Sequence, residues 1–168
     1  MSSLYRLVPA LLVLSLPALA QDGGTAAVPA PSRAPAPPLV NTPDTEALRG
    51  VAKAFFQALL ALDSRGATHL TSSPFYLEGA RLEGEEAISQ ALIRQLRSKR
   101  TDLLTLYSID VYSLEEMEQK FGKLPGRLSG MPVQERGAMF AVGNISGRAT
   151  VAMLKVVGGN WRVVGFHD

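Results

Sequence analysis

The chain has 168 residues, with 17 Lys and Arg against 15 Asp and Glu, two His and no Cys. This length is typical of one domain that buries a real hydrophobic core. Because the charges nearly balance, no strongly basic surface is predicted, and neither nucleic acid nor anionic lipid is expected as a partner. Without cysteine there is no disulfide framework, so the stability of the fold must come from packing.

The first 20 residues have the pattern of an export signal. Arg6 gives a positive start, residues 7–16 form an apolar run, and Ala18-Leu19-Ala20 is a small-x-small cleavage site. The run is shorter than the roughly 20 residues of a comfortable membrane span, although a retained N-terminal anchor is the alternative. We therefore expect cleavage after Ala20, export to the periplasm or the medium, and no stable membrane insertion afterwards.

Residues 21–41 predict a linker between the signal and the folded domain. The segment is rich in Ala, Ser and Pro and has no periodic apolar pattern, and its prolines are Pro29, Pro31, Pro35, Pro37 and Pro38. Such a composition favours a disordered leader, or a semi-rigid spacer that holds a domain away from a membrane or wall. The folded domain is then expected over residues 42–168.

Two amphipathic helices are predicted in the first half of this domain. Thr42 and Pro43 favour the start of the first, and Gly66 favours its end. Its apolar face recurs at spacings of three and four, at Leu48, Val51, Phe55, Leu59 and Leu62. The second helix is predicted over residues 85–97, with Ile88, Ala91, Leu92 and Leu96 on its inner face. A short helical turn (67–71) and two short strands (75–77 and 81–83) are expected between them.

Residues 102–112 predict a long strand, and residues 113–134 an inserted helix and loop. The odd positions of the strand, from Leu103 to Val111 with Tyr107 between them, give one largely apolar face. Ser113 and Glu116 have the spacing of a capping box, and the loop that follows is marked by Gly and Pro. Such an insertion could act as a lid or partner-binding flap, or could shield a sheet edge.

The last third of the chain predicts three consecutive strands, at about 135–145, 148–157 and 160–167. Residues 144–147 separate the first pair, and Gly158-Gly159 separates the second, where glycine tolerates the positive φ of a two-residue hairpin turn. Residues 151–154 are apolar at every position. Both faces of the sheet must therefore be covered there, either by elements of the same chain or by a second subunit.

The order of these elements resembles that of the nuclear-transport-factor-2-like, or cystatin-like, superfamily, which includes polyketide cyclases and ketosteroid isomerase. The resemblance covers about residues 43–168 and is most specific in Leu82-Glu83-Gly84-Glu85-Glu86-Ala87-Ile88 and in residues 161–167. It implies an α+β fold, in which a cone-shaped, curved antiparallel sheet packs on the N-terminal helices. Where the isomerase has an Asp-Pro that supplies its base, this chain has Ser73-Pro74, which argues against that chemistry.

Candidate site residues are few. Tyr107, His167 and His69 are weak candidates for catalysis, and His167 is predicted to share a strand face with Trp161 at the mouth of the cone. The side chains expected to line a ligand pocket are Phe55, Tyr76, Tyr107, Phe140, Trp161 and His167. No metal site and no cofactor are predicted, because no metal-binding or nucleotide-binding motif is present.

Three functions remain open on this pattern. The first is an exported, non-catalytic module that binds a small apolar ligand or a protein partner through its cavity or sheet face. The second is a small isomerase, cyclase or dehydratase that uses a pocket Tyr and His. The third is a structural domain that forms a homodimer through the sheet.

Overall fold

The computed structural model describes residues 43–168, except 98, 100, 125 and 129. The predicted signal peptide, the linker and the cap at Thr42 lie outside the described residues. The helices are α1 (Pro43–Leu60), α2 (Ser64–His69), α3 (Glu85–Arg97) and α4 (Leu114–Phe121), with 3₁₀ turns η1 (Thr101–Leu103) and η2 (Gly126–Leu128). The strands are β1 (Thr71–Leu77), β2 (Ala80–Leu82), β3 (Leu106–Ser113), β4 (Met139–Ile145), β5 (Arg148–Val157) and β6 (Asn160–His167). No helix in this described part is long and apolar enough to cross a membrane.

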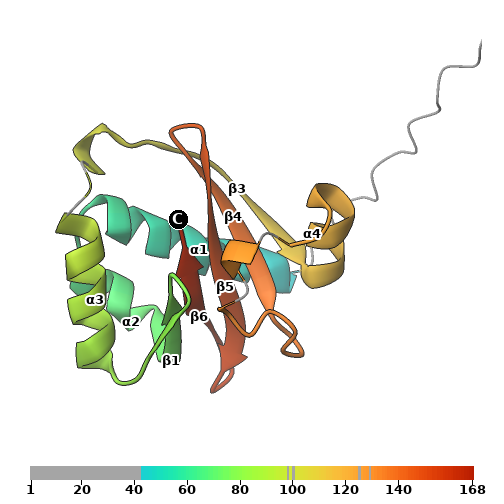
Figure 1. Cartoon of the computed structure of the whole chain (residues 1–168), viewed down its shortest axis with the longest axis horizontal. Coiled ribbons are helices and arrows are strands. Elements are labelled where there is room, and N and C mark those ends of the chain that lie inside the picture. The colour runs from blue at the N-terminus through green and yellow to red at the C-terminus, as the bar shows by residue number, and fades with distance from the viewer. Residues whose placement is uncertain (1–42, 98, 100, 125, 129) are drawn as a thin grey trace, which may run out of the picture. The chain divides into compact units, whose positions relative to one another are not determined.

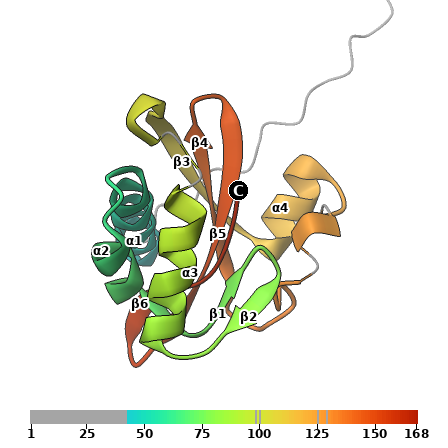
Figure 2. The same cartoon turned by 60° about the vertical axis from the view of Figure 1, so that its left-hand side comes forward.

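Within the described residues, the strands form one six-stranded sheet in the order β2-β1-β6-β5-β4-β3. Helices α1, α2 and α3 lie against one face of this sheet, and α4 lies on the other side, as Figures 1 and 2 show. The predicted α+β class is therefore confirmed, with helices packed on a curved, open sheet. We call the face under α1 and α3 the inner face and the face under α4 the outer face.

The sheet is mixed, so the prediction that it is antiparallel throughout is wrong for one pair. β1 runs parallel to β6, with Tyr76 opposite Gly165 and Leu77 opposite Phe166. These two strands are joined by most of the domain and not by a hairpin, so no short turn forces them to run in opposite directions. The other strand pairs are antiparallel.

The two predicted hairpin turns form, each with glycine at its second position. Ser146 and Gly147 turn β4 into β5 with φ of 50° and 85°, and Gly158 and Gly159 turn β5 into β6 with φ of 59° and 81°. Both dihedral pairs have the positive values of a two-residue turn that matches the twist of its strands.

Several element boundaries differ from the prediction for local reasons. α1 ends at Leu60 because Leu62 takes a positive φ of 59°, and Gly66 lies inside α2, where its amide donates to the capping carboxylate of Asp63 at 2.8 Å. β3 begins at Leu106, after the η1 turn in which the Leu104 amide donates to the Thr101 carbonyl. β4 begins at residue 139, because residues 134–137 are occupied by turns.

The hydrophobic side chains form a cluster on each face of the sheet. The inner cluster joins α1 and α3 to the sheet and includes Leu48, Phe55, Phe56, Leu92, Leu154, Val163 and Phe166. The outer cluster joins the segment from α4 to residue 133 with the sheet and includes Tyr112, Met117, Leu128, Met131, Phe140, Val151, Met153 and Val164. The apolar run at 151–154 is therefore covered on both faces by the same chain.

The segment that covers the outer face, from α4 to residue 133, is held in place at both ends of α4. Ser113 and Glu116 form the predicted capping box, in which the Glu116 amide donates to the Ser113 hydroxyl and the Ser113 amide to the Glu116 carboxylate. Near the other end, the Lys120 ammonium contacts the Tyr112 hydroxyl, and this hydrogen bond raises the pKa of Lys120. The ring of Phe121 packs edge-on against that of Tyr112, with centroids 5.6 Å apart.

Candidate functional site

The hollow between the helices and the inner face is filled by aromatic side chains. The rings of Phe55 and Phe56 both pack on Phe166, with centroid distances of 5.6 and 6.3 Å. Gly143 leaves room for the Phe56 ring, because a Cβ at this glycine would lie 3.0 Å from a ring carbon. Phe55, predicted to line a ligand pocket, is 0% exposed and belongs to this core.

Tyr107 does not share a face with the apolar residues of β3, as the alternation had predicted. Leu106 lies opposite Ile145 and Ser108 lies opposite Asn144, so Tyr107 is the extra residue of a β-bulge. A bulge shifts the alternation of the strand by one residue. As a result, the Tyr107 side chain is 68% exposed at an edge strand of the sheet.

A bulge in β6 changes the position of His167 in the same way. Val163 lies opposite Leu154 and Gly165 lies opposite Met153, so β6 has one extra residue at Val164. His167 consequently lies on the outer face, and the prediction that it shares a face with Trp161 is wrong. Its Nδ1 is 3.2 Å from Glu78 Oε2 at the end of β1.

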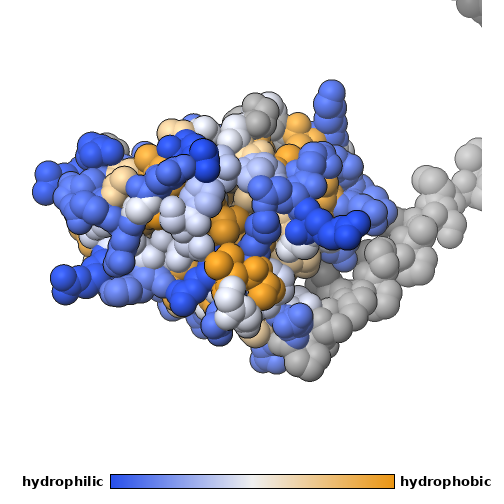
Figure 3. Space-filling model, turned by 90° about the horizontal axis from the view of Figure 1, so that it is seen from below, coloured by the Kyte–Doolittle hydropathy of each residue, from blue (hydrophilic) through white to orange (hydrophobic). Residues whose placement is uncertain are grey.

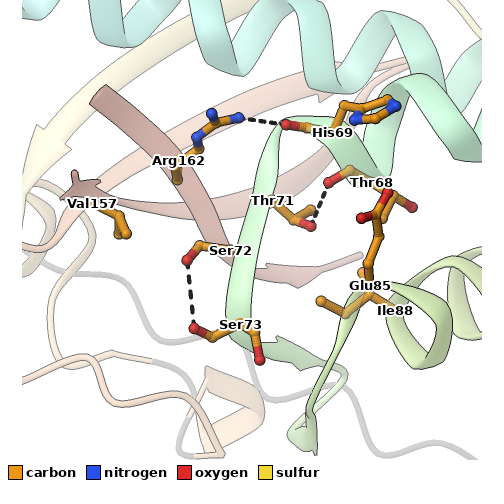
Figure 4. Close-up of a pocket in the computed structure, with 9 residues that line it drawn as sticks. All are labelled: Thr68, His69, Thr71, Ser72, Ser73, Glu85, Ile88, Val157 and Arg162. Atoms are coloured by element: carbon orange, nitrogen blue, oxygen red, sulfur yellow. Dashed lines mark hydrogen bonds between the residues drawn. The ribbon is translucent and has the colours of Figure 1, made fainter. Parts of the chain in front are cut away.

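The remaining candidates lie apart from one another. Phe140 belongs to the outer cluster and Tyr76 packs against it, Trp161 packs against the inner cluster, and His69 is exposed at the end of α2. Figure 4 shows the His69 imidazole pointing away from Ser72 and Ser73, the nearby hydroxyl groups. The structure therefore does not bring the three candidate catalytic side chains, Tyr107, His69 and His167, together.

A small apolar cavity, which we call the mouth pocket, opens at the end of the inner face where β6 ends. Its volume is about 40 Å³. It is lined by the ends of α1 and α3, the segment that enters β3, and the β4–β5 hairpin: Leu59, Leu60, Leu96, Leu104, Ile145, Thr150 and Phe166 with Gln95, Lys99, Thr101 and Asp168. The buried Thr150 hydroxyl donates to the Gly143 carbonyl at 3.2 Å, so it does not call for a ligand.

Charged side chains lie at the rim of the mouth pocket. The Lys99 ammonium pairs with the Asp168 carboxylate. The neighbouring Glu78 carboxylate accepts hydrogen bonds from the Gln95 side chain at 3.2 Å and from the Asp168 amide at 3.1 Å. Burial lowers the pKa of Lys99, and the nearby Arg148 lowers it further, while Glu78 raises it. The pocket thus has an apolar interior and a rim of both charges.

The lowered pKa of Lys99 predicts a change of stability at alkaline pH. Between the lowered pKa and the ordinary lysine pKa of 10.5, the unfolded chain binds more protons at Lys99 than the folded chain. The contribution of Lys99 to the free energy of unfolding therefore rises with pH in this range. A Lys99→Met variant should lack this contribution, which urea unfolding of both proteins across this range would measure. An identical pH dependence in both proteins would contradict the assignment.

The chain is similar to several proteins of known structure. The chain is similar to a protein of Caulobacter vibrioides with a cystatin-like fold, at 15% identity over 73% of this chain and 86% of that chain, with a TM-score of 0.49. It is also similar to an NTF2-like protein of unknown function from Pseudomonas putida, at 11% identity over 73% and 82% and a TM-score of 0.46. An NTF2-like protein with a cystatin-like fold from Novosphingobium aromaticivorans matches at 15% identity over 73% and 79%, with a TM-score of 0.44.

Two of these neighbours are NTF2-like, and the third has a cystatin-like fold. The resemblance expected from the order of elements is thus confirmed as a resemblance of fold. No protein-family model matches the chain, and no curated protein matches it. At these identities and TM-scores the similar structures carry no information about a site or an activity, so the function must be argued from this chain alone.

The mouth pocket itself was not predicted from the sequence. Leu59 and Leu96 were assigned correctly to the inner faces of their helices, but the pattern does not tell which inner residues lie at an opening. Leu104 is at an even position of the predicted strand 102–112, for which the pattern predicts no role. One sequence signal could have placed Leu104 on the inner side. Leu104 and Leu106 are both apolar and precede the bulge at Tyr107, and both pack against the inner cluster.

Proposed function

We propose that this chain is an exported, non-catalytic binding module whose mouth pocket takes a short apolar group from a small ligand. The observation that supports the proposal is the pocket itself, a cavity with leucine, isoleucine and phenylalanine walls in a domain whose inner hollow is otherwise filled. A volume of about 40 Å³ accommodates about three atoms the size of a water oxygen. The bound group is therefore short, such as the terminal propyl group of an alkyl chain.

The charged rim favours a ligand whose polar end stays outside the pocket. Lys99 and Asp168 lie beside the apolar walls, so a head group that leaves the pocket meets both a cation and an anion. A hydroxyl or an amide could accept a hydrogen bond from Lys99 or donate one to Asp168, whereas a fully apolar ligand would make no hydrogen bond to the rim. The alternative of an enzyme finds no support in the site, because Tyr107, His69 and His167 lie apart from one another.

Chemical-shift titration of the ¹⁵N-labelled protein with 1-butanol tests this function. The amides of Leu96, Ile145 and Phe166 should shift together and saturate, with a Kd of about 1 mM or weaker for so small a ligand. Leu104→Trp, which places a larger side chain in the wall, should abolish saturation.

Leu103→Trp is the matched control, because Leu103 is 65% exposed and does not line the pocket. This variant should bind 1-butanol as the unmodified protein does. Non-saturating shifts scattered over the surface, or equal binding by both variants, would contradict a site at the mouth pocket.

A further inference from the structure

At the opposite end of the sheet from the mouth pocket, three hollows adjoin one another. The first, of about 390 Å³, lies between the start of α1 and the start of β6. The second, of about 320 Å³, lies between α2, β1, α3 and the β5–β6 hairpin, and Figure 4 shows the side chains that line it. The third, of about 380 Å³, lies between α2 and α3.

The three hollows share their walls and so form one groove. Arg162 lines both the first and the second hollow. Thr68 and Glu85 line both the second and the third. We call this continuous surface the hairpin-end groove. It is independent of the mouth pocket, with which it shares no lining residue.

The charges along the groove alternate in sign when the adjacent carboxylates of Glu85 and Glu86 are taken together as one negative position. Asp44 lies in the first hollow, Arg162 between the first and the second, Glu85 between the second and the third, and Arg65 in the third. Among the residues that the structure describes, Asp44, Arg65 and Glu85 form no ion pair. Arg162 donates from one guanidinium nitrogen to the His69 carbonyl, as Figure 4 shows, which leaves the rest of the guanidinium group for another partner.

Between these charges, the walls are hydroxyl-rich, with apolar side chains at intervals. The hydroxyls come from Thr68, Thr71, Ser72, Ser73 and Ser89, and the apolar contacts from Val51, Leu70, Trp161, Ile88 and Val157. The view of this end of the molecule in Figure 3 likewise shows hydrophobic atoms near the centre, with hydrophilic atoms around them. The indole N–H of Trp161 is buried without a hydrogen-bond partner in the described part of the chain.

We infer that the hairpin-end groove binds an extended segment of a partner protein, whose basic and acidic side chains alternate to match Asp44, Arg162, Glu85 and Arg65. A polypeptide carries both signs of charge on one chain together with apolar side chains, which is the combination that these walls complement. Complementary charge patterns of this kind determine which partner binds more than how tightly it binds. A polyanion would meet Asp44 and Glu85, and a polycation would meet Arg65 and Arg162.

Fluorescence anisotropy with two synthetic peptides of identical composition tests the inference. In one peptide Lys and Asp alternate along an extended, proline-containing backbone, and in the other all Lys precede all Asp. The alternating peptide should bind about tenfold more tightly, and its affinity should fall as salt is added, because the contacts are exposed. Equal affinity for both peptides would overturn the inference, as would binding of a chitosan oligosaccharide with no binding of either peptide.

Arg162→Glu should weaken binding of the alternating peptide by about tenfold, since the substitution replaces an attraction by a repulsion. Arg136→Glu is the matched control, because Arg136 is exposed, lies outside the groove and undergoes the same charge change. Amide shifts of the unmodified protein provide a readout that needs no variant. They should be concentrated at residues 68–73, 85–89 and 160–162, and shifts centred elsewhere would overturn the assignment.

Discussion

Replacing Phe55 by alanine is expected to lower the free energy of unfolding by about 3–5 kcal/mol. Phe55 is fully buried, and its ring packs edge-on against Phe166 and beside Phe56. The substitution removes this buried ring and leaves a cavity that the surrounding aromatic side chains cannot fill. Because the whole stability of a domain is about 5–15 kcal/mol, urea unfolding followed by circular dichroism would show a large shift of the midpoint.

The size of this effect distinguishes a core residue from a residue that lines an open ligand pocket. A side chain facing an empty or solvent-filled cavity loses little packing when it is truncated. Tyr107→Ala is the matched control, since Tyr107 was predicted for the same pocket but is largely exposed at a bulge. It should change the free energy of unfolding by no more than about 0.5 kcal/mol. Comparable losses of unfolding free energy in both variants would contradict the conclusion that the inner hollow is filled.

The local signals in the sequence predicted much of this fold. Glycine at residues 158 and 159 indicated a hairpin turn that forms as expected, and the spacing of apolar residues in 85–97 gave the buried face of α3 correctly. Both depend on interactions between residues close in the chain. The parallel pairing of β1 with β6 depends on how distant segments meet, and no local pattern specifies it.

The candidate site could not be predicted as well, and β-bulges are the main reason. Strict alternation placed Tyr107 and His167 on the apolar face, and one extra residue in each of β3 and β6 moved them away from it. The hydrophobic pattern is regular on either side of the extra residue, and in β3 the bulge is marked only by the switch from Leu104 and Leu106 to Ile109 and Val111. Of the predicted pocket residues, Phe55 and Trp161 lie with the inner cluster, Tyr76, Phe140 and His167 lie on the outer side, and Tyr107 lies at the edge of the sheet.

The segment inserted between β3 and β4 explains how the apolar outer face of the sheet stays covered. Met117 of α4 and Met131 of the following loop pack with Met153 and Val151 of β5. The sequence had left a second subunit as the alternative cover for this strand. In the structure the covering side chains come from the same chain, so pairing through the outer face would first require α4 and the loop to move away.

Met117→Asp is therefore expected to release this cover and convert the outer face into a self-association surface. The Met117 side chain is buried in the outer cluster, and a carboxylate there loses about 2–5 kcal/mol of packing and solvation. Since the inner cluster shares no residue with the outer one, the loss should be local. Hydrogen exchange should become faster in residues 114–133 and stay slow in α1 and α3, and sedimentation should show dimers that increase with concentration.

Gln119→Asp provides the control for the added charge, because Gln119 is an exposed residue of the same helix. It should leave both the exchange pattern and the sedimentation unchanged. If Met117→Asp instead accelerated exchange equally in the inner cluster, the two clusters would unfold as one unit and the cover could not open separately. The segment 114–133 could also open while the chain stays monomeric at all concentrations. In that case the outer face would lack the complementarity that a homodimer through the sheet requires. Exposed apolar area alone does not make a specific interface.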